Sequence, residues 1–289
     1  MSPRHAAPRR AARPRRGAQA RRPSEPLRRR VGRRLPSGAR ILAGLLAVGL
    51  VAGFVFLLDG PWLRITEVEW HGRALAAEGD LVAETADARG QNTLLVDSEA
   101  LRRQVEALPA VAAAQVDVRL PGRISITLEE EAPALVWRTR AVQLVAAQDG
   151  TIIGQVARDT ALDEPLAALP FVDDERPESR NLTVGDRLAP GELAIARRLA
   201  TVEPAALGST TSHLTVRIDD ENGFVLDSAD PAWSAAFGLY GMDPEVTQDA
   251  MARIERQVGG VRTLFAEEPE TTIGWLDVRN PGRVYWRPR

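Results

Sequence analysis

The feature that most constrains this chain is an apolar run, Ile41–Leu58, whose eighteen residues include no charged or strongly polar side chain. A helix rises about 1.5 Å per residue, so this run would form a helix about 27 Å long, close to the hydrocarbon thickness of a bilayer. A buried helix of a soluble protein usually keeps a polar face, which this run lacks. We therefore predict a single membrane-spanning helix over residues 41–58.

Formal charge differs between the two sides of this run. Residues 1–40 contain 14 Arg, one Glu and no Asp or Lys, which gives a charge of +13. The whole chain carries −2, so −15 remains for residues 59–289. Basic flanks of membrane helices stay in the cytoplasm. The sequence therefore predicts a single-pass protein with a cytoplasmic N-terminus and an acidic extracytoplasmic part.

A cleavable signal peptide is the competing interpretation of the apolar run. Signal peptides have a shorter charged region, an apolar core of about 7–15 residues and a small-x-small cleavage site. Here the run leads into Asp59-Gly60-Pro61-Trp62, which contains no such site. Trp62 suits a membrane–water interface, and packing in the folded part is an equal alternative for it. We favour an uncleaved signal anchor.

The first 40 residues are rich in Arg, Pro and Ala and show no apolar periodicity. This composition predicts a disordered arm. Its simplest roles are to set the topology and to attract anionic lipids of the inner membrane. A cytoplasmic protein partner is an alternative, whereas nucleic-acid binding is not favoured, because no aromatic side chains lie between the arginines.

Cysteine is absent from the chain. The exported part therefore cannot rely on disulfide bonds, and it must be stabilised by burial of an apolar core, for which its length is sufficient.

The segment after the apolar run is predicted to form a β-α-α-β-β unit. Ile65–Trp70 is predicted to be a strand, and Ala76–Arg89 a short helix that Gly90 closes. Asp97 is predicted to cap a second helix. Apolar residues at i, i+4 and i+7 mark its buried face: Leu101, Val105 and Leu108.

Two further strands are predicted to form a hairpin around Pro121-Gly122. In each strand apolar residues alternate with polar ones, which predicts one buried face. The residues predicted to face the core are Val116, Val118, Leu120, Ile124, Ile126 and Leu128.

Three strings in this unit follow one another in a specific order. They are ITEVEWHG at residues 65–72, GQNTLLVD at 90–97 and LPAVAAAQVDVRLPGRISITLEEEAPALVW at 108–137. In this order, directly after a signal anchor, they resemble the POTRA domain of the FtsQ/DivIB family of bacterial cell-division proteins. The resemblance implies a POTRA domain over residues 63–133.

Residues from 134 onwards predict a second unit with a mostly antiparallel sheet. Apolar runs flank the turn dipeptides Asp149-Gly150 and Asn222-Gly223, which predicts two hairpins. The four strands are Val142–Ala146, Thr151–Val156, Leu214–Ile218 and Phe224–Asp227. A Pro-rich loop is predicted between the hairpins, with Pro165, Pro170 and Pro177.

Two helices and two strands complete the second unit. Gly191–Val202 is predicted to be helical, and a second helix is predicted after Pro244. Its apolar residues are spaced 3, 4, 3 and 4 apart: Met251, Ile254, Val258, Val261 and Phe265. The chain is predicted to end with strands at Thr272–Val278 and Arg283–Trp286, joined by a turn at Asn280-Pro281-Gly282.

These predictions amount to an α+β fold in four parts. They are a disordered arm at residues 1–40, a transmembrane anchor at 41–58, the POTRA domain at 63–133, and a second mixed α/β domain at 134–289.

No residue pattern in the chain predicts catalysis, a cofactor or a metal ion. Histidine occurs only at His5, His71 and His213, without the spacing of zinc ligands, and neither a nucleophile elbow nor a phosphate loop occurs. The acidic run Asp219-Asp220-Glu221 lacks the alternating spacing of a calcium loop, so a solvated hairpin tip is favoured. We expect a protein that is not an enzyme and binds no small-molecule substrate.

The C-terminal strand is the predicted binding site. If Arg283–Trp286 is the last strand of its sheet, backbone groups on its outer edge are unpaired, and a partner strand can add there. Aromatic and Arg side chains, which are common at interface hot spots, concentrate nearby. An ordinary core role is an equal alternative for Trp275 and for Trp286. The predicted partner-binding residues are Trp275, Asp277, Arg279, Arg283, Val284, Tyr285 and Trp286.

The final string, IGWLDVRNPGRVYWRPR at residues 273–289, also resembles the FtsQ/DivIB family. The resemblance implies a non-enzymatic divisome scaffold of the bacterial inner membrane at the division septum. It implies that the terminal edge receives a strand of an FtsB/DivIC-type partner, with FtsL-type proteins, septal cell-wall synthase and FtsK-type components as further partners. Arg279 and Trp286 match residues that the family uses there, whereas Asn280 replaces an aromatic residue. Residues 228–250 fit the family only loosely.

Two other functions stay open at this point. A POTRA-bearing protein-assembly or transport chaperone would predict tandem POTRA repeats, which the sequence does not show. An exported enzyme of unknown type would predict activity of the purified extracytoplasmic part, for example peptidoglycan hydrolysis.

Overall fold

The computed structural model describes residues 38–239, 246–280 and 282–289. The predicted apolar helix is confirmed as α1, Gly38–Asp59. Among the described residues it is the one helix long and apolar enough to cross a membrane, with a mean hydropathy of 2.2 over Gly38–Phe56. Its large apolar side chains are exposed, as a lipid-facing helix requires. Most of the predicted arm, together with Pro244 and Pro281, lies outside the described residues.

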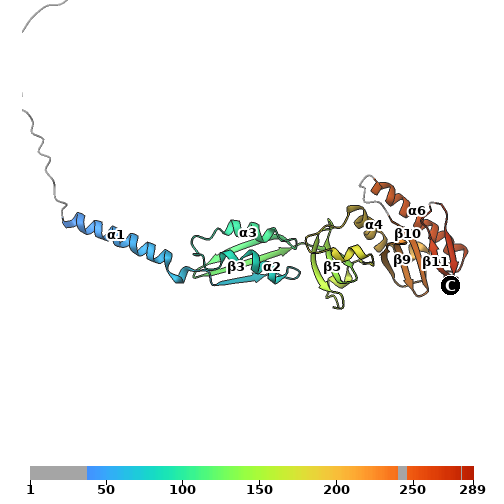
Figure 1. Cartoon of the computed structure of the whole chain (residues 1–289), viewed down its shortest axis with the longest axis horizontal. Helices are drawn as coiled ribbons and strands as arrows, with labels where there is room; N and C mark the ends of the chain where they lie inside the picture. Colours follow the sequence, from blue (N-terminus) through green and yellow to red (C-terminus); the bar gives the residue numbers. More distant parts are fainter. Residues whose placement is uncertain (1–37, 240–245, 281) are drawn as a thin grey trace, which may run out of the picture. The chain divides into compact units, whose positions relative to one another are not determined.

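The predicted β-α-α-β-β unit forms a three-stranded sheet with two helices, and α3 packs on β2 (Figure 1). The strand order is β1-β3-β2, with β1 parallel to β3 and β2 antiparallel to it. The bounds are β1 (Glu67–His71), α2 (Glu78–Glu84), α3 (Ser98–Glu106), β2 (Val111–Arg119) and β3 (Arg123–Glu130).

The helix cap in this unit is confirmed. The Asp97 side chain accepts hydrogen bonds from the backbone N–H groups of Glu99 and Ala100, at 3.1 and 2.9 Å. The single helix predicted over Ala76–Arg89 is wrong, because α2 ends at Glu84 and a separate 3-10 turn follows. Thr85, where the backbone leaves the α conformation, separates the two.

The predicted inward face of the hairpin is confirmed except at Leu120. Ile124, Ile126 and Leu128 of β3 are buried, and Val116 and Val118 of β2 are partly buried. Leu120 is 61% exposed. The alternation fails there because β2 ends one residue earlier and Leu120 belongs to the turn.

In the described part of the chain, the second sheet has nine strands, in the order β12-β11-β10-β9-β8-β7-β4-β5-β6. Five of its eight neighbouring pairs are antiparallel, which confirms a mostly antiparallel sheet and an α+β fold. The strands are β4 (Pro133–Arg138), β5 (Val142–Ala147), β6 (Ile152–Ala157), β7 (Phe171–Asp174), β8 (Leu214–Asp219), β9 (Gly223–Ala229), β10 (Ala232–Gly238), β11 (Ile273–Asp277) and β12 (Tyr285–Pro288).

Strand β7 corrects the prediction of a continuous Pro-rich loop, because it lies in the middle of the sheet, parallel to both β4 and β8. The strand was not predicted because two of its four residues are consecutive acidic residues, which are uncommon in a buried strand. One of them, Asp174, is buried because it accepts hydrogen bonds from the Trp137 indole and the Arg176 guanidinium, which also binds Glu192. A buried carboxylate in a strand is tolerated when its charge is paired in this way.

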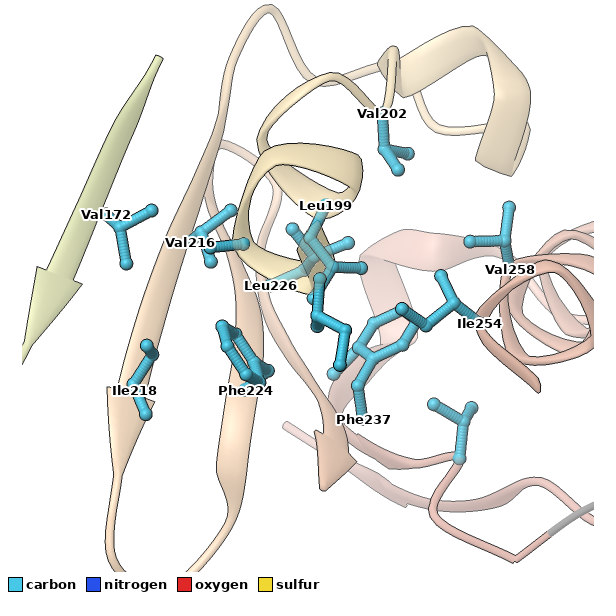
Figure 2. Close-up of a cluster of buried hydrophobic side chains, with 14 of the residues drawn as sticks. Val172, Leu199, Val202, Val216, Ile218, Phe224, Leu226, Phe237, Ile254 and Val258 are labelled. Carbon is cyan, nitrogen blue, oxygen red and sulfur yellow. The ribbon is translucent and has the colours of Figure 1, made fainter. Parts of the chain in front are cut away.

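The core of the second sheet lies between its strands and two helices, α4 (Pro190–Ala200) and α6 (Val246–Glu267). Figure 2 shows Leu199 of α4 and Ile254 of α6 directed toward Phe237 and the strands. The predicted stripe on α6 is confirmed, because its three central residues are buried and its two ends pack against the core. The remaining short helices are α5 (Pro204–Leu207) and the 3-10 turns at Pro61–Leu63, Ala86–Ala88, Leu166–Ala168, Pro177–Asn181 and Glu270–Thr272.

The predicted Asn222-Gly223 hairpin is confirmed between β8 and β9, and glycine is required there for two reasons. Gly223 has φ +69°, and an added Cβ would lie 2.2 Å from the carbonyl carbon of Gly238 on β10. Gly208 provides a comparison, because its φ is +72° but an added Cβ would meet only a flexible Arg262 carbon at 4.0 Å.

We expect Gly208→Ala to lower the free energy of unfolding by about 1–2 kcal/mol, the cost of left-handed backbone for a residue with a Cβ. Gly223→Ala should cost about 1–3 kcal/mol more, because the backbone of β10 must also move. Denaturant unfolding of the full chain in detergent, followed by near-ultraviolet circular dichroism, measures both variants. Equal losses would contradict the close contact with β10.

Candidate partner-binding edge

The C-terminal strand β12 forms one edge of the nine-stranded sheet, and among the described residues β11 is its single neighbour. At the opposite edge, the first part of β6 is covered, because Ile152 exchanges backbone hydrogen bonds with Gly185 and Asp186 at 2.8–2.9 Å. Within the described part of the chain, no backbone hydrogen bond joins the outer side of β12 to another segment. The outer side of β12 is therefore open to a further strand.

The observed strand is shifted from the predicted one by two residues. It covers Tyr285–Pro288 rather than Arg283–Trp286, so Arg283 and Val284 precede the strand instead of belonging to it. Val284 packs against the core just before the strand, and pairing with β11 begins at Tyr285. Pro288 has no backbone N–H to donate. This is tolerated at the end of an edge strand, where no neighbouring strand needs that donor.

The two faces of this edge carry different predicted residues. Residues that pair across two strands share a face, and Leu276 pairs with Trp286 while Asp277 pairs with Tyr285. Leu276 is fully buried in the core that includes α6, so Trp286 lies on that side. Trp275, Asp277 and Tyr285 therefore lie on the opposite face. The structure thus divides the seven predicted residues between two surfaces.

A groove of about 430 Å³ lies between α6 and the segment that leads into β12. Arg283, Val284 and Trp286 line it from the C-terminal segment. Val284 lies directly against Gly260 of α6, where an added Cβ would be 3.0 Å from Val284 Cγ2. The small residue on the helix therefore allows the C-terminal segment to approach closely.

Two side chains of α6 hold this region together. The Gln257 amide is buried and donates hydrogen bonds to the carbonyls of Phe237 and Val278, at 2.9 and 2.7 Å. The Arg253 guanidinium donates to the carbonyl of Arg279 at 2.6 Å. Helix α6 is therefore fixed both to β10 and to the chain just after β11, which makes the groove a preformed feature.

Asp277 and Arg279 form a bidentate ion pair at the end of β11. The guanidinium donates from Nε to Asp277 Oδ1 at 3.0 Å and from Nη2 to Oδ2 at 2.6 Å. These hydrogen bonds lower the pKa of Asp277 and raise that of Arg279. Arg279 also donates to the carbonyl of Glu221 at 3.3 Å, so it joins the edge to the tip of the β8–β9 hairpin.

The sequence left a core role open for Trp275 and Trp286, and the exposed fraction of each aromatic side chain helps to decide between a core role and a surface role. Tyr285 is 49% exposed and Trp286 is 38% exposed, whereas Trp275 is half-buried. Large aromatic side chains at this level of exposure beside a groove are typical of binding surfaces. A surface role is favoured for Trp286, and Trp275 serves partly to cover the sheet.

The contribution of α6 to this site was not predicted from the sequence. Its groove-lining residues include Arg256, Gly260, Thr263 and Glu267. They are spaced 4, 3 and 4 residues apart, so they form one face of the helix. That face lies next to the buried apolar face of α6. That second stripe could have been found in the sequence, but only the tertiary structure shows that it faces the C-terminal segment.

The acidic residues of the chain bear on the predictions about metal sites. Among the described residues, no three His, Asp or Glu side chains form a group suited to a metal ion. At the acidic hairpin tip, Asp219 Oδ1 accepts backbone hydrogen bonds from Glu221 and Asn222, at 3.0 and 2.6 Å. This carboxylate therefore stabilises the turn.

Comparison with known proteins gives one family. Residues 63–131 match the model of the FtsQ-type POTRA domain. The chain is 29% identical over 265 residues to "Cell division protein FtsQ" of Chloroflexus aurantiacus, covering 90% of this chain and 86% of the relative. It is 25% identical over 246 residues to the protein of the same name from Myxococcus fulvus, covering 84% and 82%. A third relative of this name, from Chloroflexus aggregans, is 30% identical over 183 residues, or 63% of each chain.

We expect Asp277→Asn to lower the free energy of unfolding by about 1 kcal/mol at neutral pH. A hydrogen-bonded charge contributes about 1.5–3 kcal/mol, but the Arg279 side chain is 40% exposed, and solvent screening reduces the gain. Because the folded-state pKa of Asp277 is lowered, this stabilisation is present above the ordinary value of 3.8 and is lost as pH falls through the lowered value.

Denaturant unfolding of both proteins between pH 7 and pH 2 tests this expectation. The difference between wild type and variant should be constant down to about pH 5 and should shrink below pH 4. A difference that does not change with pH would show that Asp277 stabilises the edge without its charge.

Proposed function

The chain belongs to the FtsQ family of cell division proteins, and we propose that it is a membrane-anchored scaffold, not an enzyme, which holds other division proteins together. The observation that carries the proposal is the open side of β12 next to a preformed groove. A sheet edge and a groove are binding features, and neither needs a reacting side chain.

The open side of β12 supports binding by strand addition. In this mode the backbone of an extended partner continues the hydrogen-bond ladder, and side-chain pockets give specificity. Trp286 lines the groove on one face, and Tyr285 lies on the other. A strand added at β12 would therefore contact an exposed aromatic residue on each face of the sheet. Trp275, Asp277, Arg279, Arg283 and Val284 complete the proposed site.

The charge of the groove supports a partner with acidic residues. The residues that line the groove include three arginines, Arg253, Arg256 and Arg283, and one carboxylate, that of Glu267. This concentration of positive charge contrasts with the −15 carried by residues 59–289 as a whole. Complementary charge speeds association and selects between partners. We propose that the partner places an apolar segment with acidic residues in the groove, next to the strand that it adds to β12.

Within this family we propose FtsB/DivIC-type proteins as the partner at β12, together with FtsL-type proteins. Septal cell-wall synthase and FtsK-type components are the partners proposed for other surfaces. Proteins anchored in one membrane have a high effective concentration relative to one another, so a modest interface is sufficient.

The proposed topology places residues 1–40 in the cytoplasm and residues 41–58 in the inner membrane. The POTRA domain at 63–133 and the second domain at 134–289 are then extracytoplasmic, at the division septum. The support is the excess of arginine on one side of α1.

We expect Trp286→Ala to weaken capture of the FtsB-type partner by at least about 1 kcal/mol, because a large aromatic side chain is lost from the proposed contact. Pull-down with the full chain in detergent measures the loss. Trp62→Ala is the matched control, since Trp62 is 64% exposed and lies outside the nine-stranded sheet. An unfolding midpoint like that of wild type shows that the Trp286→Ala variant is folded. Unchanged capture by that folded variant would refute the proposed edge.

Protease treatment of intact spheroplasts tests the topology. We expect cleavage of the chain beyond residue 60 and protection of residues 1–40, because only the C-terminal part would be outside. Treatment of lysed spheroplasts is the control and should remove both parts. Protection of residues beyond 60 in the intact spheroplasts would reverse the proposed orientation.

A further inference from the structure

A second exposed apolar surface lies at one end of the three-stranded sheet. Among the described residues outside α1, five large apolar side chains are more than half exposed. One of them, Leu239, borders residues outside the described set. The other four, which we call the apolar tip, are Trp62 (64%), Leu94 (52%), Leu95 (71%) and Leu120 (61%).

Backbone pairing brings the turn that contains Trp62 close to the loop that contains Leu94 and Leu95. Arg64 and Asn92 form an antiparallel bridge, and the N–H of Thr93 donates to the carbonyl of Leu63 at 2.7 Å. Trp62 lies in the 3-10 turn Pro61–Leu63, directly before Arg64, and Leu94 and Leu95 lie in the loop directly after Thr93.

Backbone pairing also brings Leu120 to this end. Glu67 of β1 pairs in parallel with Arg123, the first residue of β3, and Leu120 lies in the turn just before that residue. The N–H of Thr66 donates to the carbonyl of Gly122 at 2.8 Å, which holds the turn against the same segment. The start of the unit, the loop before α3 and the β2–β3 turn thus meet at one end.

Exposed arginines surround the apolar tip. Arg64 lies between the two pairings, Arg89 lies just before the segment that pairs with residues 63–65, and Arg119 precedes Leu120. Within the described part of the chain, none of the three forms an ion pair with a carboxylate. Free guanidinium groups beside apolar side chains match the phosphate and acyl layers of a phospholipid surface.

The length of the chain identifies the occupant of this surface. Helix α1 ends at Asp59 and Trp62 is three residues later. Even fully extended, three residues span no more than about 11 Å. If α1 is in a bilayer, the apolar tip is therefore held near the headgroups by covalent connection alone, and Trp is a residue that prefers this layer.

We propose that the apolar tip is a lipid-binding surface, with its four apolar side chains in the interfacial layer and Arg64, Arg89 and Arg119 against lipid phosphates. The proposal rests on the membrane anchoring proposed for α1. It gives the POTRA domain a second point of attachment to the membrane besides the anchor. That attachment limits rotation of the domain about the short connection at residues 60–62.

The absence of cysteine from the chain makes a site-specific test direct. The full-length variants Leu95→Cys, Ala112→Cys and Leu50→Cys are each labelled with an environment-sensitive fluorophore. They are reconstituted into vesicles of phosphatidylethanolamine and phosphatidylglycerol. Ala112 is the matched control, because it is exposed at the opposite end of the same sheet, near the start of β2. Leu50 lies in α1 and reports on the anchor.

Quenching by aqueous iodide and by lipids with a nitroxide at defined depth is then compared among the three sites. We expect the label at residue 95 to be several-fold less accessible to iodide than the label at residue 112. It should also be quenched by a shallow nitroxide, as for a contact about 5–10 Å into the headgroup boundary. The label at residue 50 should be quenched by a deep nitroxide.

Each outcome decides between the alternatives. Equal iodide access at residues 95 and 112, with residue 50 still quenched from the lipid, overturns the apolar tip and leaves the anchor intact. Loss of lipid quenching at residue 50 overturns the anchor itself. Protection of residue 95 that appears only in native membranes identifies a protein partner, and protection that disappears on dilution of protein in lipid identifies a second copy. Either of these last two results refutes the lipid contact.

Discussion

The parallel pairing of β10 with β11 determines the geometry of the candidate site. Parallel neighbours cannot be joined by a tight turn, so the chain must cross over the sheet between them. Helix α6 lies in that crossover, and its apolar stripe covers the core beneath Leu276. The last two strands are therefore added beyond the helix, where β12 is left at the edge. The same helix forms one wall of the groove beside it.

Buried polar groups make this arrangement specific. Gln257 on α6 binds carbonyls of two separate segments, so a shift of the helix along the sheet would leave buried polar groups unpaired. The paired charges of Asp174, Arg176 and Glu192 do the same for β7 in the middle of the sheet. A sheet fixed at its centre and at its covered end can present an open edge without losing its register. The binding proposed at β12 would then require little reorganisation of the chain, which favours affinity.

The two proposed surfaces have different physical characters. The edge at β12 offers backbone hydrogen bonds beside a groove, which suits a protein strand. The apolar tip offers exposed apolar side chains and free arginines, which suits lipid. The first surface is formed by a sheet that spans most of residues 133–288, and the second by three loops at one end of another sheet. The two proposals thereby place membrane attachment and partner recognition in different parts of the chain.

The sequence by itself determined the apolar helix, the asymmetry of charge, the Asp97 cap, the two hairpins and the buried stripe of α6, because each depends on residues close together in the chain. It also indicated an aromatic C-terminal strand. Only the tertiary structure decided that β7 is a central strand, because its acidic residues are neutralised by Arg176, whose second partner Glu192 is distant in sequence. The exposure of Leu120 and the groove on α6 were likewise decided by contacts between distant segments. Periodicity records which side of an element is apolar, but not which partner, solvent or membrane that side meets.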